Sequence, residues 1–261
     1  MLSGKKFLVT GVLNESSIAY SAARQLQQQG AEIVLTSYGR ARRLTERCAE
    51  RLPTTPQVLE LDVTRPADFE ALGDRLARMW GQLDGALHAV AFAPETCLGG
   101  DFLRPRWEDV SVALEVSAYS LKALAETVAP LMEGRGGSLV GLDFDAGQAW
   151  PDYNWMGVAK AALESTARYL ARDLGPRGIR VNLVSAGPLS TIAANAIPQI
   201  DALQQVWKAR APLGWDPSDP DPAGRTCVTL LSDWLPATTG EIVHVDGGAH
   251  AIGMAPDERT P

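Results

Sequence analysis

The sequence predicts an α/β fold, a single-domain Rossmann-like, doubly wound parallel sheet of about seven strands with helices on both faces. Short apolar runs rich in Leu and β-branched residues alternate with longer amphipathic segments along the chain. Most of the short runs show little polar alternation, which is typical of parallel strands covered on both faces. A chain of 261 residues with 46% hydrophobic and 21% charged residues has enough apolar material for one large core.

The strands are expected where the apolar runs lie, and each is followed by a polar turn or by Gly or Pro. In chain order they occupy residues 5–11, 31–37, 57–63, 85–94, 136–144, 179–188 and 240–248.

Helices are expected between the strands. Residues 17–30 end in a Gly suited to a helix C-terminus, and residues 65–81 have a Pro in the first turn and stop at Gly. Further amphipathic patterns cover residues 108–133, 152–175 and 222–232. We expect one domain over residues 1–252, a surface loop over 216–222 and a C-terminal tail over 253–261 that is disordered or docks only in an oligomer.

The bulk composition narrows the function classes. The net charge of −7 argues against a nucleic-acid surface, which needs clustered Lys and Arg. Three widely spaced cysteines suggest neither a disulfide framework nor a metal pair, so we expect no metal and a reducing compartment. No apolar run is long enough for a spanning helix or for a signal segment, and the expected location is cytoplasmic.

The first strand leads into VTGVLNESSIA (9–19), in which a Gly precedes a polar turn and a helix. In such folds the helix N-terminus holds a pyrophosphate, but only Gly11 fits the full Gly-rich motif, and a simple turn capped by Ser16 or Ser17 explains the pattern equally well. Asp62, at the end of the third strand, either accepts a bond from an adenine amino group or caps a turn.

The end of the second strand, TSYGR (36–40), bears on the choice of cofactor. It has no acidic residue for a ribose 2′-hydroxyl. Tyr38 could stack on adenine, and Arg40 could meet a 2′-phosphate or face solvent. These residues leave the choice between NADH and NADPH open.

The stretch DYNWMGVAK (152–160) carries a Tyr and a Lys seven positions apart. Seven residues are about two helical turns, so Tyr153 and Lys160 share one face at a separation of roughly 10 Å along the axis. A direct hydrogen bond between them is not expected. Met156 stands where a spacing of four would place the Tyr, and it cannot donate a proton.

Four strings together resemble the enoyl-[acyl-carrier-protein] reductases of the short-chain dehydrogenase/reductase superfamily, in particular the mycobacterial long-chain type. The strings are GLDFD (141–145), YNWMGVAKAALE (153–164), SAGPLST (185–191) and LLSDWLPATTGEIVHVDGGAH (230–250), and the likeness spans about residues 1–252. It implies hydride transfer from a nicotinamide, NADH with NADPH not excluded, to the β-carbon of a trans-2-enoyl thioester.

The resemblance also implies residue roles. Tyr153 would donate to the thioester oxygen, Lys160 would bind the nicotinamide ribose, and Phe144 would flank the reacting group. Cofactor contacts would come from Gly11, Ser17, Ile18, Tyr38, Asp62, Val63, Val90, Ala91, Val116, Lys160, Gly187, Leu189 and Thr191. Substrate contacts would come from Tyr153, Met156, Ala93, Ile197 and Trp207.

Two departures from the family pattern stand out. Where the family reads HSIGF, this chain reads HAVAF (88–92), so Ala89 lacks a hydroxyl and Ala91 adds a methyl. These changes mean either local repacking with weaker nucleotide affinity or an altered site. The helical lid expected over about residues 191–212 is shorter than in the mycobacterial type, which predicts medium rather than very long acyl chains.

Alternative functions remain at this point. They are a specialised secondary-metabolite enoyl reductase, a ketone or alcohol dehydrogenase of the wider superfamily, and a non-catalytic nucleotide-binding regulator. Met156 weighs against the dehydrogenase, and Tyr153 with Lys160 weighs against the regulator. The expected partner is an acyl-carrier protein or a coenzyme A thioester, and the family resemblance implies a homotetramer.

Overall fold

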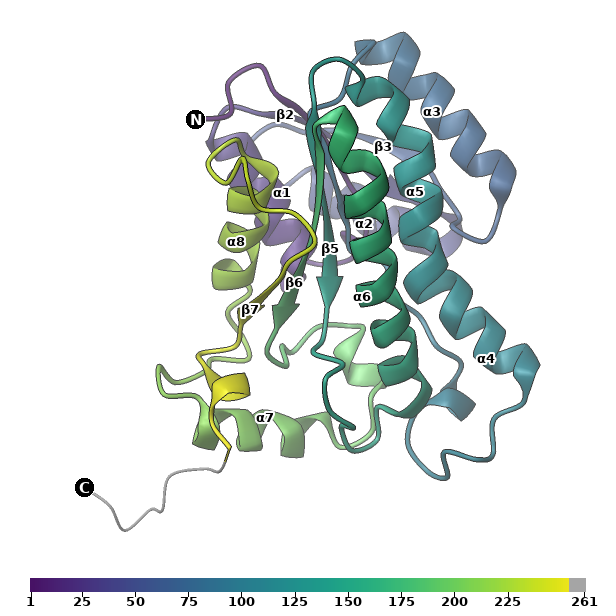
Figure 1. Ribbon diagram of the computed structural model, residues 1–261, viewed down its shortest axis with the longest axis vertical. Helices are drawn as coiled ribbons and strands as arrows, with labels where there is room; N and C mark the ends of the chain where they lie inside the picture. The colour runs from purple at the N-terminus through teal and green to yellow at the C-terminus, as the bar shows by residue number, and fades with distance from the viewer. Residues whose placement is uncertain (254–261) are drawn as a thin grey trace.

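The computed structural model describes residues 1–253 and contains one parallel sheet in the order β3-β2-β1-β4-β5-β6-β7 (Figure 1). All six neighbouring strand pairs are parallel. The strands are β1 (Lys6–Val9), β2 (Glu32–Ser37), β3 (Gln57–Glu60), β4 (Gly85–His88), β5 (Gly137–Asp143), β6 (Ile179–Ala186) and β7 (Ile242–Val245). The predicted fold class is therefore confirmed.

Helices cover both faces of the sheet. The helices of the described chain are α1 (Ile18–Gln28), α2 (Arg42–Ala49), α3 (Pro66–Trp80), α4 (Trp107–Leu114), α5 (Ser120–Val128), α6 (Asn154–Leu174), α7 (Ile200–Arg210) and α8 (Asp221–Leu231). In Figure 1, α1 and α8 lie on the left of the sheet and α3, α5 and α6 lie on the right. One buried cluster lies on each side, around Phe7 and Leu26 on the α1 side and around Leu76 and Leu163 on the α6 side.

Local sequence explains where several helices begin and end. The hydroxyl of Ser17 accepts a bond from the backbone N–H of Tyr20 and so caps α1. Pro66 opens α3, and Gly81 ends it in the left-handed region that Gly adopts without strain. These positions agree with the sequence signals within one or two residues.

Three elements differ from the sequence prediction. The helix expected over 108–133 is divided by a π-helical turn over Glu115–Tyr119, which inserts an extra residue between α4 and α5. The strand expected over 85–94 ends at His88, and the following residues cross the end of the sheet as a loop. Helix α2 was not predicted, and its sequence, RRLTERCA, has only a narrow apolar stripe.

The carboxyl ends of all the strands lie at one edge of the sheet, the lower edge in Figure 1, where α7 runs beneath them. This edge is where ligands bind in open parallel sheets. In the described part of the chain, no helix combines the length and apolar character needed to cross a bilayer. Of the tail predicted over residues 253–261, residues 254–261 lie outside the described residues.

Candidate active site

A cavity of about 600 Å³ opens at the carboxyl edge of the sheet. Its walls come from the ends of β1 to β6, from the first turns of α6 and from the lid. The predicted cofactor residues all line this cavity, namely Gly11, Ser17, Ile18, Tyr38, Asp62, Val63, Val90, Ala91, Val116, Lys160, Gly187, Leu189 and Thr191. Tyr153, Phe144, Met156, Ala93 and Ile197 line it as well.

At one end of the cavity the backbone of Gly11 passes unusually close to the backbone of Ala89. Gly11 has a φ of +79°, and a Cβ at this position would lie 1.9 Å from the carbonyl oxygen of Ala89. Only Gly fits there. The buried side-chain oxygen of Asn14, which also borders the cavity, has no hydrogen-bond partner within the described chain. Asn14 was not singled out from the sequence, where it reads as an ordinary turn residue.

The Asp62 carboxylate accepts bonds from the backbone N–H of Thr64 at 3.0 Å and from its hydroxyl at 2.7 Å. The turn-capping role considered from the sequence is therefore present, while Asp62 also borders the cavity. Tyr38 is about half exposed at the same end. Arg40 is exposed and does not line the cavity.

Tyr153 and Lys160 lie on the cavity wall, two helical turns apart. Helix α6 begins at Asn154, so Tyr153 lies just before the helix, whereas the expected range of 152–175 placed it in the first turn. Its φ of −86° and ψ of −27° are nearly helical. The ammonium of Lys160 donates a hydrogen bond to the carbonyl oxygen of Leu142 at 2.8 Å. Tyr153 and Lys160 form no hydrogen bond with each other in the described structure, as expected from their spacing.

Asp143, at the end of β5, is a site residue that sequence reasoning missed. Both of its carboxylate oxygens are buried without a hydrogen-bond partner among residues 1–253. Burial raises its pKa to about 7, although the charge of Lys160 opposes this. An acidic residue at the end of an apolar strand, GSLVGLD, is the signal that could have revealed it.

The same burial acts on the neighbouring groups. It lowers the pKa of Lys160, and the carboxyl of Asp143 partly offsets that effect. Burial also raises the pKa of Tyr153, and the charge of Asp143 adds to the increase. The Tyr153 phenol is therefore held in its protonated form at neutral pH.

An aromatic wall closes one side of the cavity. Phe144 contacts Tyr153 at a ring-centroid distance of 5.1 Å and Trp207 at 5.5 Å, and Trp150 lies 4.9 Å from Trp207. Trp207 is buried behind Phe144 and does not line the cavity. The prediction that Trp207 contacts substrate is therefore not matched, because helix α7 turns this side chain inward against the aromatic residues.

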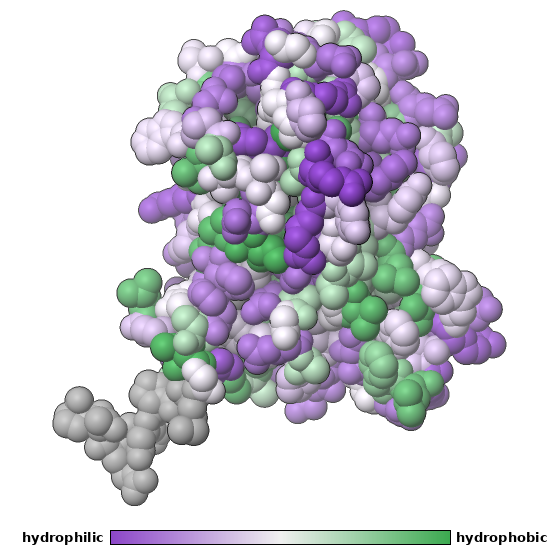
Figure 2. Space-filling model, viewed as in Figure 1, coloured by the Kyte–Doolittle hydropathy of each residue, from purple (hydrophilic) through white to green (hydrophobic). Residues whose placement is uncertain are grey.

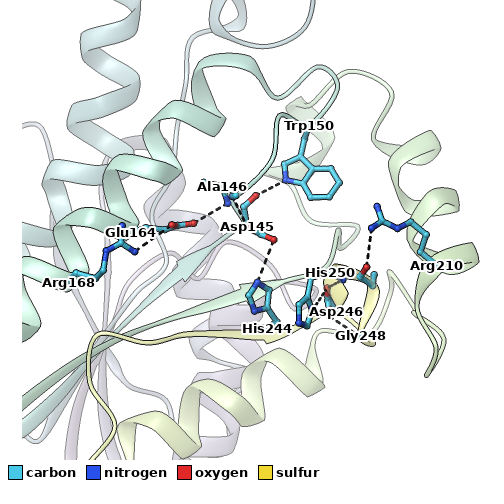
Figure 3. Close-up of polar contacts among 12 residues, drawn as sticks. Asp145, Ala146, Trp150, Glu164, Arg168, Arg210, His244, Asp246, Gly248 and His250 are labelled. Atoms are coloured by element: carbon cyan, nitrogen blue, oxygen red, sulfur yellow. Dashed lines mark hydrogen bonds and ion pairs between the residues drawn. The ribbon is translucent and has the colours of Figure 1, made fainter. Parts of the chain in front are cut away.

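A polar network supports this wall from behind (Figure 3). The Trp150 indole N–H donates to the carbonyl oxygen of Asp145 at 2.6 Å, and the Glu164 carboxylate accepts from the backbone N–H of Ala146 at 3.0 Å. His244 of β7 lies 3.6 Å from the Asp145 carboxylate. The loop after β5 is thus tied to both α6 and β7. In residues 1–253, no three His, Cys, Asp or Glu side chains come together as a metal site.

A family model described as enoyl-(acyl carrier protein) reductase matches residues 11–250. The chain belongs to this family. Among its relatives, the enoyl-[acyl-carrier-protein] reductase [NADH] of Mycolicibacterium smegmatis is 45% identical, over 95% of this chain and 97% of that protein. The protein of the same name from Mycobacterium avium is 44% identical over 95% of this chain and 97% of its own length. The Aquifex aeolicus enzyme is 41% identical over 97% of this chain and 94% of its own length.

Within this enoyl reductase family member, the two departures in HAVAF both fall on the cavity wall. Ala89 packs against the core cluster on the α1 side, and its backbone N–H donates to the Thr10 hydroxyl at 2.9 Å. Ala91 is exposed, and its φ is not positive, so its backbone does not require Gly. The added methyl of Ala91 therefore narrows the cavity without straining the chain.

Proposed function

We propose that this protein reduces the trans-2 double bond of an enoyl thioester with NADH, in fatty-acid or related acyl-chain biosynthesis. The observation that carries the proposal is the placement of Tyr153 and Lys160 on one cavity wall, two turns apart, with Met156 between them. The relatives named as NADH enoyl reductases support it over nearly the whole chain.

The residues at the α1 end fit a dinucleotide. Gly11 borders the cavity beside the N-terminus of α1, where backbone N–H groups lack partners within the helix and can donate to a pyrophosphate. The buried side-chain oxygen of Asn14 offers an unused acceptor. Lys160 has three N–H donors, and among residues 1–253 only one of them forms a hydrogen bond, to the carbonyl oxygen of Leu142, so the others can hold ribose hydroxyls. When bound, NADH supplies the hydride.

At the other end of the cavity, Tyr153 is placed to act on the substrate. Its hydroxyl bonds to no group among residues 1–253, and it stays protonated because burial and Asp143 raise its pKa. It can therefore donate a hydrogen bond to the thioester oxygen as negative charge develops there. Phe144 and Met156 supply the apolar walls that keep water from this oxygen.

The domain limits, the assembly and the location belong to the same proposal. Residues 1–252 form one domain, with a lid over about 191–212 and a tail from 253. The protein acts as a homotetramer in the cytoplasm on an acyl-carrier-protein thioester. Exposed aromatic residues on α4 and α6 (Trp107 and Tyr169) favour association, and Figure 2 shows apolar residues exposed at the lower right. Sizing chromatography tests the assembly.

The test is oxidation of NADH and NADPH with crotonyl and dodecenoyl thioesters of coenzyme A and of acyl-carrier protein, beside a panel of ketones. Turnover of the enoyl thioesters with NADH is expected. Turnover confined to ketones would instead show an alcohol dehydrogenase, and cofactor binding without any turnover would show a regulatory protein.

A further inference from the structure

The rim of the cavity beside Tyr153 has a fixed side, made by residues 97–102 and 152–155. The backbone N–H of Gly99 donates to the carbonyl oxygen of Asp152 at 2.8 Å, and the Asn154 amide donates to the carbonyl oxygen of Gly99 at 2.6 Å. The Trp155 indole N–H bonds the carbonyl oxygen of Phe102 at 3.1 Å, and the two rings stack. These contacts bind the loop firmly to the start of α6.

The lid crosses to this fixed rim at one place. The amide of Gln199 donates to the Asp152 carboxylate at 3.0 Å. Pro198 lies over Gly99 so closely that a Cβ on Gly99 would be 2.8 Å from its ring. Ile197, the next residue back, packs on the apolar cluster that contains Tyr153 and Met156, and it lines the cavity.

The backbone is strained on both sides of this contact. Asp152 has a φ of 60° and Gln199 a φ of 54°, a region that residues with side chains seldom adopt. Such conformations persist where surrounding contacts hold them, and they concentrate at clamps and switches. Residues 192–199 are otherwise mostly exposed, and their other backbone bonds are local. Little else fastens this part of the lid.

We propose that Asp152 and Gln199 form a latch that fastens the lid over the cavity beside Tyr153 and so restricts the enzyme to short and medium acyl chains. The inference rests on the proposed function. An acyl chain whose thioester oxygen lies at Tyr153 extends past Met156 toward Ile197. A long chain needs Ile197 and Gln199 to move outward, which breaks the latch, whereas a short chain does not.

The experiment compares three latch variants with a surface control. Asp152→Gly removes the carboxylate and keeps a residue that accepts positive φ. Gln199→Glu places a second carboxylate opposite Asp152, and Asp152→Asn retains an acceptor for Gln199. Gln205→Glu makes the same chemical change as Gln199→Glu at an exposed position of α7 outside the cavity. Each full-length protein is assayed with enoyl thioesters of 4, 8, 12 and 16 carbons, and amide hydrogen exchange of the lid is measured without ligand.

Loss of the latch is expected to raise the ratio of kcat/KM for 16 carbons over that for 4 carbons about fivefold, in line with one modest hydrogen bond. Exchange at Asn195 and Ile197 should also become faster in Asp152→Gly and Gln199→Glu but not in Asp152→Asn or Gln205→Glu. An unchanged chain-length profile with unchanged exchange would overturn the latch. If the unmodified protein reduces no enoyl thioester, the proposed function fails. The amide hydrogen exchange of the lid in the variants still shows whether Asp152 holds Gln199.

Discussion

Lys160 directs its ammonium to the carbonyl oxygen of Leu142 at 2.8 Å and forms no ion pair with Asp143, the next residue of β5, in the described structure. The carboxyl of Asp143 is thus buried without a bonded partner, and its charge acts on Lys160 and Tyr153 only through space. The ammonium of Lys160 is therefore free to bind a ligand. The protonation state of Asp143 depends on its burial and on the charges around it.

Asp143→Asn should change how stability depends on pH. The pKa of Asp143 is raised to about 7 from an ordinary value near 3.8, so the stability linked to its protonation is full below the ordinary value and is lost as pH rises through about 7. The Asn variant does not ionise, so its stability does not fall in this way as the pH rises. We expect its Tm at pH 8 to exceed that of the unmodified protein by at least about 2–4 °C, the change for each kcal/mol in a domain of this size.

The gain at pH 8 should shrink at pH 5, where the carboxyl of Asp143 is protonated and, like the amide that replaces it, carries no charge. Asp74→Asn, at an exposed position of α3, serves as the control and should shift neither Tm. Equal Tm differences at both pH values would show that Asp143 is ionised throughout. Thermal unfolding monitored by circular dichroism measures each case.

Tyr153→Phe should lower kcat about 100-fold while changing the Kd for NADH less than about twofold. The variant retains the ring against Phe144 but loses the single hydroxyl donor for the thioester oxygen, a loss that typically costs two to three orders of magnitude. Tyr169→Phe, on the exposed face of α6, is the matched control. Steady-state kinetics and cofactor titration separate the two effects, and an equal loss in both would contradict this assignment.

Lys160→Met should weaken NADH binding about 10- to 100-fold, because a hydrogen bond from a charged group contributes about 1.5–3 kcal/mol. Met fills similar space at this buried position and avoids leaving a cavity. Lys122→Met, on the solvent-facing side of α5, should bind NADH normally. Fluorescence titration gives the affinities, and an unchanged Kd for Lys160→Met would assign the ribose contact to another residue.

Gly11→Ala should destabilise the fold and weaken cofactor binding together. Its Cβ would overlap the carbonyl oxygen of Ala89, and the φ of +79° adds strain, so the loss of unfolding free energy should reach about 2 kcal/mol or more. Gly4→Ala has a matching φ of +74° but meets no atom within 4 Å, so it isolates the conformational cost of about 1 kcal/mol. Urea unfolding compares the pair, and equal losses would rule out a steric cause.

Ala91→Gly should tighten NADH binding by about threefold, since Ala91 lines the cavity and removal of its exposed methyl gives the cofactor more room without requiring a new backbone conformation. This result would favour the weaker-affinity interpretation of HAVAF. A Kd that stays constant while the preferred enoyl chain length changes would favour an altered substrate site. Parallel titrations and chain-length assays distinguish the two.

The parts of the site that the sequence predicted are those with a local signal. Apolar strands, Gly11, the Ser17 cap and the spacing of Tyr153 and Lys160 each follow from nearest neighbours along the chain. The inward turn of Trp207 could not be predicted this way, because it depends on Phe144 and Trp150 from a distant loop. Helix α2 escaped prediction because its burial against the sheet involves only Thr45, Cys48 and Ala49.

The unpartnered state of Asp143 also depends on tertiary structure, since it requires α6 to cover the end of β5. The π-helical turn at Glu115–Tyr119 likewise has no sequence signature, although it falls where Val116 reaches the cavity. Sequence patterns therefore indicate which residues share an edge of the sheet, while packing decides which of them face a ligand.

The pairing of Trp150 with Trp207 behind Phe144 gives the protein an intrinsic optical reporter. The two indoles lie 4.9 Å apart at a tilt of 51°, close enough for their excited states to couple and to give a strong near-ultraviolet dichroism signal. Because Phe144 separates them from the cavity by one ring, a ligand or a lid movement that shifts Phe144 also changes this signal. Events at the reacting end can thus be followed in the unlabelled chain.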